Sequence, residues 1–147
     1  MVHRSKPKLP IVRDPKPSQV TDADWLRAER KAGEYPDHTE RGGKWLVFVN
    51  ATHVDEVWAK IKDATEKGLL GGLAKVSTAM SGHNTTNPDS KVICVYTYDW
   101  TDEEDVRRVR GKLRELGILA KIPYKADSDT LAGSYAIRDK RISKYYE

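Results

Sequence analysis

The sequence contains a single cysteine, Cys94, among its 147 residues. One cysteine cannot form a disulfide within the chain, and its apolar neighbours indicate a small core residue. No apolar run approaches the length of about 18 residues that a membrane helix needs. The first ten residues, MVHRSKPKLP, lack the apolar segment of a signal peptide. We therefore expect a cytoplasmic protein that does not enter a membrane.

The sequence also lacks the short motifs that carry common chemistry. It has no metal-ligand cluster, no phosphate-binding P-loop, no dinucleotide fingerprint and no nucleophile elbow. The four histidines, His3, His38, His53 and His83, fall in the N-terminal segment, in polar loops or at a helix start. We therefore expect no metal and no cofactor.

The net charge of +4 is concentrated at the N-terminus. Residues 1–20 carry five basic residues and one acidic residue, whereas the rest of the chain has 21 of each kind. This segment also holds four of the seven prolines. Such a composition is typical of a solvated terminus, and it could also touch RNA or an acidic surface without specificity. We therefore predict a basic, proline-rich flexible arm over residues 1–20 and a single α+β domain over residues 21–147.

Capping patterns and apolar periodicity predict the elements of this domain. Helices are expected from the capping boxes at Thr21, Thr52 and Thr101, ending near Lys31, Gly68 and Gly117, with Trp25 on the buried side of the first. Strands are expected over residues 45–49, 73–79, 92–98 and 118–125, with a short edge strand at 135–137. The turn-rich residues 81–90 predict a mobile loop.

Each predicted helix has one apolar stripe, so each can cover only one face of a sheet. The fold class is therefore α+β, with a curved antiparallel sheet and about three helices on one face. Alternation then assigns the strand residues to two faces. The covered face receives Ala74, Val76, Ile93, Val95, Ala120 and Ile122, and the open, concave face receives Lys75, Ser77, Cys94, Tyr96, Tyr98, Lys121 and Lys125.

Aromatic and basic residues of this kind suit an anionic ligand. Lys75 interrupts a small, apolar strand and is a solvent-facing lysine, a phosphate contact or a general base. The segment after Tyr124-Lys125, with Asp127, Thr130 and Gly133, predicts either a phosphate-binding turn or a simple surface turn. Arg110 flanks a helix stripe, where it pairs with a carboxylate or reaches a ligand. The predicted ligand site comprises Lys75, Tyr96, Tyr98, Arg110, Lys121, Tyr124, Lys125, Thr130 and Tyr135.

The four tryptophans invite a comparison with cap-binding proteins, in which two indoles hold a methylated base. Trp45 and Trp58 are expected in the core, and Trp25 in helix packing. Trp100, just past a strand end, is the one candidate for an exposed stacking surface. One such residue does not form a sandwich, so we do not expect specific cap binding.

Several blocks of the sequence resemble a known family. They are GKWLVFV (43–49), DEVWAKIKDAT (55–65), LGGLAKVST (70–78), VICVYTYDWTDEEDV (92–106) and YKADSDTLAGSY (124–135). These blocks resemble the basophilic-leukaemia-expressed protein family, which is associated with a phosphothreonine lyase domain. The resemblance implies the fold of the mRNA cap-binding translation initiation factor, a curved antiparallel sheet backed by helices. Fold alone does not give function.

The lyase association implies elimination of phosphate from phosphothreonine, which needs a base, an acid and cations that hold the phosphate. Lys75 would be the catalytic base, with Lys125 and Arg110 holding the phosphate. The bacterial effector lyases use a Lys-x-His pair, which this chain lacks.

Two main functions follow from these observations. The first is non-enzymatic binding of a phosphate-bearing ligand, namely a nucleotide, an RNA end or a phosphopeptide, on the concave face. The alternative is a phosphothreonine lyase-like enzyme. A third reading is a protein-interaction scaffold that uses the helical face and the RISKYY tail. The expected partners are therefore a phosphorylated small molecule, RNA or a phosphopeptide, with no membrane, and the sequence leaves the oligomeric state open.

Overall fold

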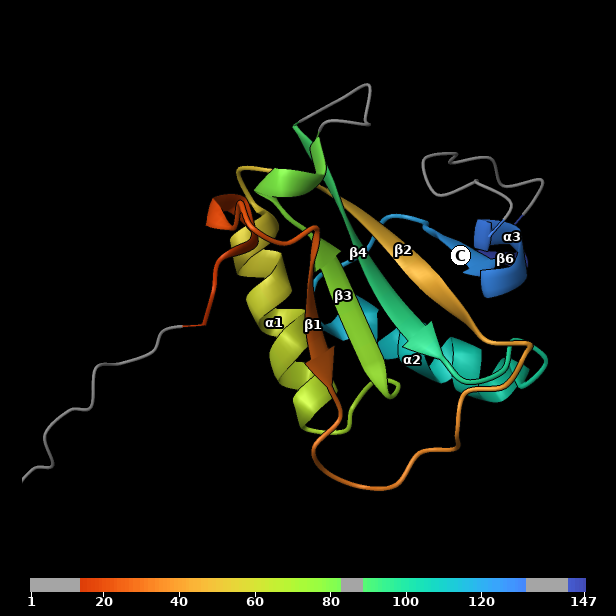
Figure 1. Cartoon of the computed structure of the whole chain (residues 1–147). Helices are drawn as coiled ribbons and strands as arrows, with labels where there is room; N and C mark the ends of the chain where they lie inside the picture. The colour runs from red at the N-terminus through yellow and green to blue at the C-terminus, as the bar shows by residue number, and fades with distance from the viewer. Residues whose placement is uncertain (1–13, 83–88, 132–142) are drawn as a thin grey trace, which may run out of the picture.

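A six-stranded antiparallel sheet forms the centre of the molecule (Figure 1). The computed structural model describes residues 14–82, 89–131 and 143–147. The strand order is β1-β3-β4-β2-β5-β6. The strands are β1 (Trp25–Glu29), β2 (Gly43–Asn50), β3 (Leu73–Ser77), β4 (Ser90–Thr97), β5 (Pro123–Ala126) and β6 (Tyr145–Tyr146). The helices are α1 (Val54–Glu66), α2 (Glu103–Glu115) and α3 (Asp127–Leu131), with 3-10 turns η1 (Pro17–Gln19) and η2 (Ala79–Gly82).

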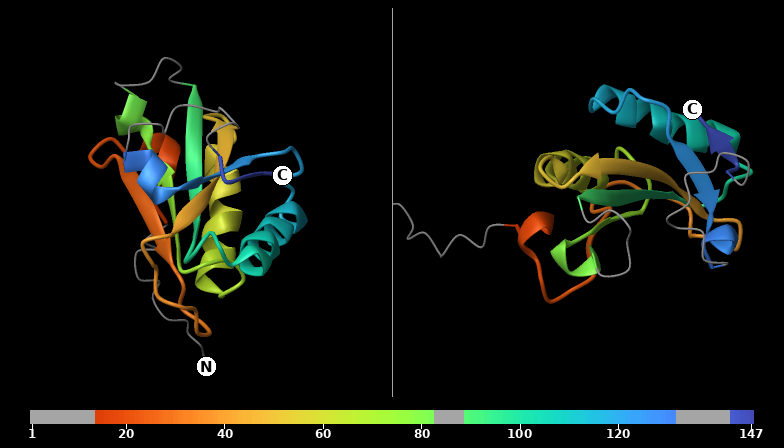
Figure 2. Two further views of the ribbon diagram at one scale, coloured as in Figure 1. Left: turned by 90° about the vertical axis from the view of Figure 1, so that its right-hand side faces the viewer. Right: turned by 90° about the horizontal axis from the view of Figure 1, so that it is seen from above.

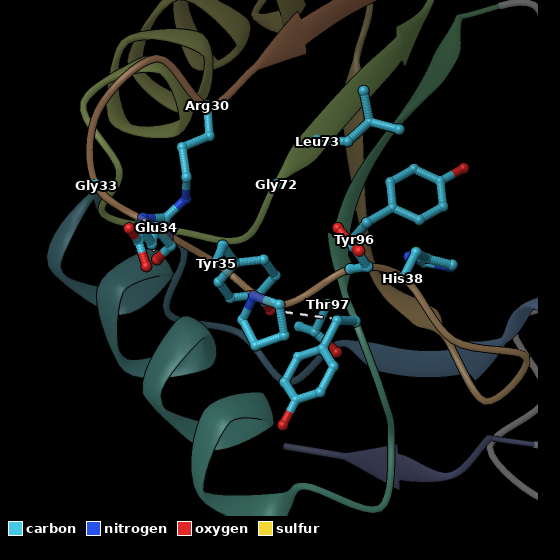
Figure 3. A pocket seen from close by; sticks show the side chains of 12 residues that line it. Arg30, Gly33, Glu34, Tyr35, His38, Gly72, Leu73, Tyr96 and Thr97 are labelled. Carbon is cyan, nitrogen blue, oxygen red and sulfur yellow. Dashed lines mark hydrogen bonds between the residues drawn. The ribbon is translucent and has the colours of Figure 1, made fainter.

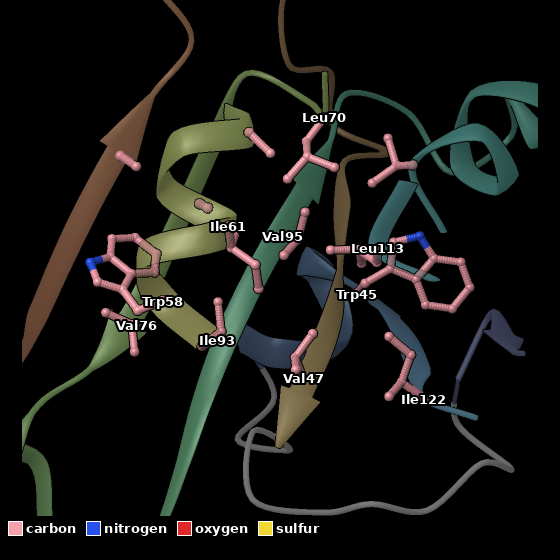
Figure 4. Close-up of a cluster of buried hydrophobic side chains, with 14 of the residues drawn as sticks. Trp45, Val47, Trp58, Ile61, Leu70, Val76, Ile93, Val95, Leu113 and Ile122 are labelled. Carbon is pink, nitrogen blue, oxygen red and sulfur yellow. The ribbon is translucent and has the colours of Figure 1, made fainter. Parts of the chain in front are cut away.

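The two long helices, α1 and α2, cover one face of this sheet (Figure 2). Their apolar stripes pack with inward-facing strand residues in one continuous core (Figure 4). Trp45 is fully buried there, and its indole Nε1 donates to the carbonyl of Val106 on α2 at 3.0 Å. The short α3 follows β5 directly and lies on the opposite side of the sheet (Figure 2). Among the described helices, none has the length and apolar character of a membrane span.

The fold-class prediction is confirmed, but the first predicted helix is wrong. Residues 25–29 form β1, which pairs with β3 in the register Trp25↔Ser77 to Glu29↔Leu73. The local capping pattern at Thr21 is overruled because the sheet supplies these residues with backbone hydrogen-bond partners, while Ala28 is buried in the core. Sheet pairing, a long-range effect, therefore decided the structure of this segment.

The other predicted elements agree with the structure except at their ends. The strand expected over residues 118–125 is only β5, beginning at Pro123. Ala120 and Lys121 precede it and are exposed, so neither lies on the sheet face to which alternation assigned it. The expected edge strand at 135–137 lies outside the described residues, as does the larger part, 83–88, of the predicted mobile loop.

Residues 14–20, the end of the predicted arm, contact α1. Ser18 donates from its backbone N–H and from its hydroxyl to the two carboxylate oxygens of Asp55, at 2.9 and 2.5 Å. Lys62 Nζ lies 3.3 Å from an oxygen of Asp14. Residues 1–13 lie outside the described part of the chain, and the division into arm and domain stays a prediction.

Candidate functional site

The sheet register places three lysines on the face opposite α1 and α2, which we call the open face. Lys44 on β2 lies opposite Lys125 on β5 and opposite Tyr96 on β4. Lys75 on β3 lies opposite Cys94 on β4. Because facing residues in a sheet point to the same side, these side chains share one surface. Three separate strands therefore each contribute a lysine to the open face.

A carboxylate and an imidazole complete this group. Lys44 is only 1% exposed, and its Nζ lies 2.9 Å from Oδ1 of Asp127, the first residue of α3. Oδ2 of Asp127 lies 2.7 Å from Nε2 of His38 in the β1–β2 connection. We call Lys44, Lys75, Lys125, His38 and Asp127 the open-face cluster.

A glycine makes this arrangement possible. A Cβ atom on Gly42 would lie 1.9 Å from Nε2 of His38, so the ring fits only because residue 42 has no side chain. The backbone N–H of Asp127 donates to the carbonyl of Gly42 at 2.9 Å. This bond holds the start of α3 beside His38, whose imidazole contacts the Asp127 side chain.

The cluster is electrostatically unbalanced toward positive charge. Burial lowers the pKa of Lys75 below its usual value, and the neighbouring charges of Arg27 and Lys44 act in the same direction. Cys94 and Asp127 oppose this shift. The Lys75 Nζ also lies 4.0 Å from the ring centroid of Trp25 on β1. The positive charges of three lysines therefore gather on the open face, and such a gathering attracts an anion.

A pocket of about 710 Å³ adjoins the cluster (Figure 3). His38 belongs to both, and the ring centroid of Tyr96, which lines the pocket, lies 5.9 Å from Lys44 Nζ of the cluster. The pocket lies between the β1–β2 connection and the adjoining ends of β3 and β4. Its lining residues are Arg30, Gly33, Glu34, Tyr35, Pro36, Asp37, His38, Gly72, Leu73, Tyr96, Thr97 and Tyr98.

Tyr35 holds the β1–β2 connection against the rest of the domain. Its hydroxyl donates to Asp105 on α2 at 2.5 Å and accepts from the backbone N–H of Tyr98 at 3.2 Å. Burial and then the hydrogen bond to Asp105 raise the pKa of Tyr35. The ring of Tyr35 meets that of Tyr98 edge-on, and the guanidinium of Arg30 lies 4.8 Å from its centroid. These contacts fix an aromatic wall of the pocket.

The structure brings some of the predicted site residues together and separates others. Lys75, Tyr96 and Lys125 lie on the open face, as expected from alternation. Tyr98 lies beyond the end of β4 and lines the pocket. Its hydroxyl donates to Asp102, and this hydrogen bond is the first cause that raises the pKa of Tyr98 to about 12.

Tyr124 and Arg110 lie on the other side of the sheet, so their predicted placement at the ligand site is wrong. Tyr124 precedes Lys125 in β5 and must therefore point to the opposite face. It is buried in the core, where its hydroxyl lies 2.6 Å from that of Thr97. Arg110 on α2 is also buried, and its guanidinium donates to the carbonyls of Glu147, Ile118 and Ala120.

Lys121 is exposed in the connection before β5 and is not on the open face. Trp100 is half-buried, with Lys144 Nζ 4.3 Å from its ring centroid, and its carbonyl accepts from Tyr145 at 2.6 Å. It packs against the core instead of offering a bare stacking surface. Thr130 belongs to α3, but its side chain is outside the described part of the structure, and Tyr135 lies wholly outside the described residues.

The sequence did not bring Lys44, His38 and Asp127 together as one site: Asp127 was expected only in the turn after Lys125, and Lys44 and His38 were expected in no ligand site. Lys44 had a usable signal, because it stands two residues before Leu46 in β2 and alternation assigns both to one face. His38 and Asp127 carried no such signal, since they are 89 residues apart and meet only through the path of the β1–β2 connection and the start of α3. No group of three or more His, Cys, Asp and Glu side chains in the described residues forms a metal site.

Solved structures that resemble this arrangement of strands and helices include eIF4E proteins. The fold is similar to schistosome eIF4E complexed with m7GpppA and 4E-BP, with TM-score 0.58, 18% identity, and coverage of 74% of this chain and 60% of that one. It is also similar to C. elegans eIF4E-3 in complex with the 4E-binding protein Mextli and a cap analog, with TM-score 0.50, 23% identity, and coverage of 63% and 54%.

These identities establish a likeness of fold alone. The chain spans between 54% and 60% of the length of these proteins. The family relation comes from the sequence. A family model for the basophilic leukemia-expressed protein Bles03 matches residues 37–131, a region that contains β2 to β5 together with His38 and Asp127. The chain therefore belongs to the Bles03 family.

Proposed function

We propose that the protein is a non-enzymatic module that binds a phosphate-bearing ligand on its open face. The observation that carries this proposal is the group of three lysines, Lys44, Lys75 and Lys125, which three strands contribute to the open face of the sheet, Lys44 and Lys125 being buried there. Lysine ammonium groups donate strong hydrogen bonds to phosphate oxygens, and burial strengthens their electrostatic attraction for an anion.

The adjoining pocket favours a nucleotide or an RNA end among the possible ligands. His38 belongs to the cluster and lines the pocket, and the Tyr96 ring of the pocket lies 5.9 Å from Lys44 Nζ, so a phosphate on the lysines would be next to aromatic rings. Stacking on aromatic side chains is a common way to hold a base. The eIF4E structures with the same fold contain m7GpppA or m7GpppG, which agrees with this ligand class. A phosphopeptide would use the lysines but would have no need of stacking rings.

An enzyme that eliminates phosphate from phosphothreonine is the second candidate. One observation favours it: burial lowers the pKa of Lys75, which increases the fraction of neutral amine available as a base. In this reaction Lys75 would take the α-proton, the Cβ–O bond would break, and the phosphate would leave with a proton from His38. The lysines of the cluster would hold the departing phosphate.

Lys75→Gln tests the binding function, because it removes the charge while keeping most of the side chain. We expect wild-type protein to bind GTP in isothermal titration at low salt, and Lys75→Gln to bind about tenfold more weakly. Lys112→Gln is the matched control, because it removes the same charge from the helical face. Lys112 lies on α2, and its side chain is 39% exposed. Equal affinities of the two variants would refute the site, as would no binding at millimolar GTP.

A phosphothreonine peptide distinguishes the two candidate functions. Binding with no change in peptide mass supports the module. Loss of phosphoric acid, seen by mass spectrometry as a dehydrated residue, would establish the lyase, and this loss should stop in Lys75→Gln. Release of phosphate with intact threonine would indicate a phosphatase and would contradict both candidates.

A further inference from the structure

We propose that Asp127 is an internal anion that occupies the phosphate position of the open-face cluster, and that a bound phosphate displaces it. This inference rests on the proposed function and adds to it a mechanism of selection. Asp127 lies between two donors, with one oxygen 2.9 Å from Lys44 Nζ and the other 2.7 Å from His38 Nε2. A carboxylate accepts only, so both neighbours present a hydrogen to it. A phosphate oxygen pair would accept the same two hydrogen bonds.

The surroundings of Asp127 permit its side chain to leave. Lys44 is almost fully buried, with 1% exposure, and is held at the floor of the site. The side chains of Asp127 and His38 are 32% and 46% exposed, so the outer side of the cluster is open to solvent. The half-exposed Asp127 and His38 therefore give a ligand a route to Lys44 from their side.

The exchange needs only a rotation of one side chain. The backbone N–H of Asp127 donates to Gly42 at 2.9 Å, and Ala126 beside it pairs with Gly43 in the sheet. These bonds fix the backbone of Asp127 at the end of β5. Rotation about Cα–Cβ would move the carboxylate into solvent while β5 and the start of α3 stay in place.

Charge decides which ligands can complete this exchange. Asp127 brings one negative charge, and an incoming group must compensate Lys44 at least as well. A terminal phosphate carries close to two charges at neutral pH, and a polyphosphate carries more. A phosphodiester within a nucleic-acid strand carries one. The cluster is therefore suited to a terminal phosphate or a polyphosphate, such as the end of an RNA or a nucleoside triphosphate, and not to the interior of a strand.

Asp127→Asn tests the internal anion directly. We expect the variant to bind GTP about tenfold more tightly than wild-type protein, because no charged competitor has to be displaced. The unliganded variant should nevertheless melt at a lower temperature, because buried Lys44 loses its charged partner. A residue with a purely structural role would lower the melting temperature without tightening binding. Asp63→Asn is the control, because it removes the same negative charge from α1, on the helical side of the sheet.

The outcomes separate this inference from the proposed function. If wild-type protein binds GTP and Asp127→Asn binds no more tightly, Asp127 is not a competitor and the proposed function stands. If Asp63→Asn tightens binding equally, the effect is one of net charge, and the inference is refuted. If neither wild-type protein nor Asp127→Asn binds GTP, both proposals fail.

A second measurement uses only wild-type protein, so it does not depend on the folding of a variant. GTP should shift the NMR resonances of the His38 imidazole, whose carboxylate neighbour is replaced by phosphate. His53, the residue before α1, should show no shift. Binding of GTP that leaves the His38 resonances unchanged would overturn the inference.

Discussion

Arg110→Lys should destabilise the protein by about 2–3 kcal/mol without weakening ligand binding. The Arg110 guanidinium is 2% exposed and spreads three hydrogen bonds over three backbone carbonyls. The distances are 2.8 Å to Glu147, 2.9 Å to Ile118 and 2.7 Å to Ala120. Two of these bonds tie α2 to the connection that leads into β5, and the third ties it to Glu147, the residue after β6. Arginine suits this task because its planar head directs several N–H groups at once.

The magnitude follows from the bonds that lysine cannot make. A lysine at position 110 keeps the charge, and so the cost of burying it, but its compact ammonium cannot reach three carbonyls that lie in different directions. We assume that one bond survives and two are lost, at about 1–1.5 kcal/mol each. For a chain of this size, the melting temperature would fall by about 5–10 °C.

Urea unfolding of wild-type protein and Arg110→Lys measures this difference. Arg114→Lys is the control, because Arg114 is exposed and the one side-chain hydrogen bond recorded for it within the described residues is that to the carbonyl of Leu119, at 3.0 Å. We expect the control to change the unfolding free energy by less than about 0.5 kcal/mol. A loss below about 0.5 kcal/mol for Arg110→Lys would refute the structural role. Normal stability with loss of GTP binding would return Arg110 to the ligand site.

Two further predictions concern other parts of the domain. Asp99 is buried, and hydrogen bonds from Arg41 and then from Thr101 hold its pKa well below the ordinary value, so the unfolded chain takes up a proton first as the pH falls. The stability that Asp99 contributes is complete at neutral pH and decreases below about pH 4. Asp99→Asn should therefore make the unfolding free energy less dependent on pH in acid. An unchanged pH profile of the unfolding free energy would contradict this. Gly71→Ala should destabilise by about 2 kcal/mol or more, because its Cβ would lie 2.0 Å from the carbonyl oxygen of Tyr96. Gly111→Ala in α2, where a Cβ meets nothing within 4 Å, should raise the unfolding free energy by up to about 1 kcal/mol. Equal effects of the two substitutions on the melting temperature would disprove the close approach at Gly71.

Local patterns in the sequence determined the fold class and most of its elements. The apolar runs became β2 and β4, and the capping boxes at Thr52 and Thr101 precede α1 and α2. Alternation assigned Lys75, Tyr96 and Lys125 to the open face because side-chain direction in a strand depends only on position along that strand. These features are local, so a single sequence is enough to reveal them.

The error at residues 21–31 has a physical cause of another kind. A capping pattern stabilises a helix start by about 1 kcal/mol, whereas pairing with β3 supplies hydrogen-bond partners for a whole strand. The identity of that partner strand depends on residues 73–77, which are far away in the sequence. Long-range pairing of this kind cannot be read from a local pattern.

The sequence by itself determined that this is an α+β domain with lysines and tyrosines on one sheet face. Only the tertiary structure decided which of these residues meet. It buried Tyr124 and Arg110 on the other side of the sheet, and it brought Lys44 on β2 together with His38 from the β1–β2 connection and Asp127 from the start of α3. The reason is that alternation fixes the direction of a side chain within its own strand, while the neighbours it meets are set by strand order and by the paths of the connections.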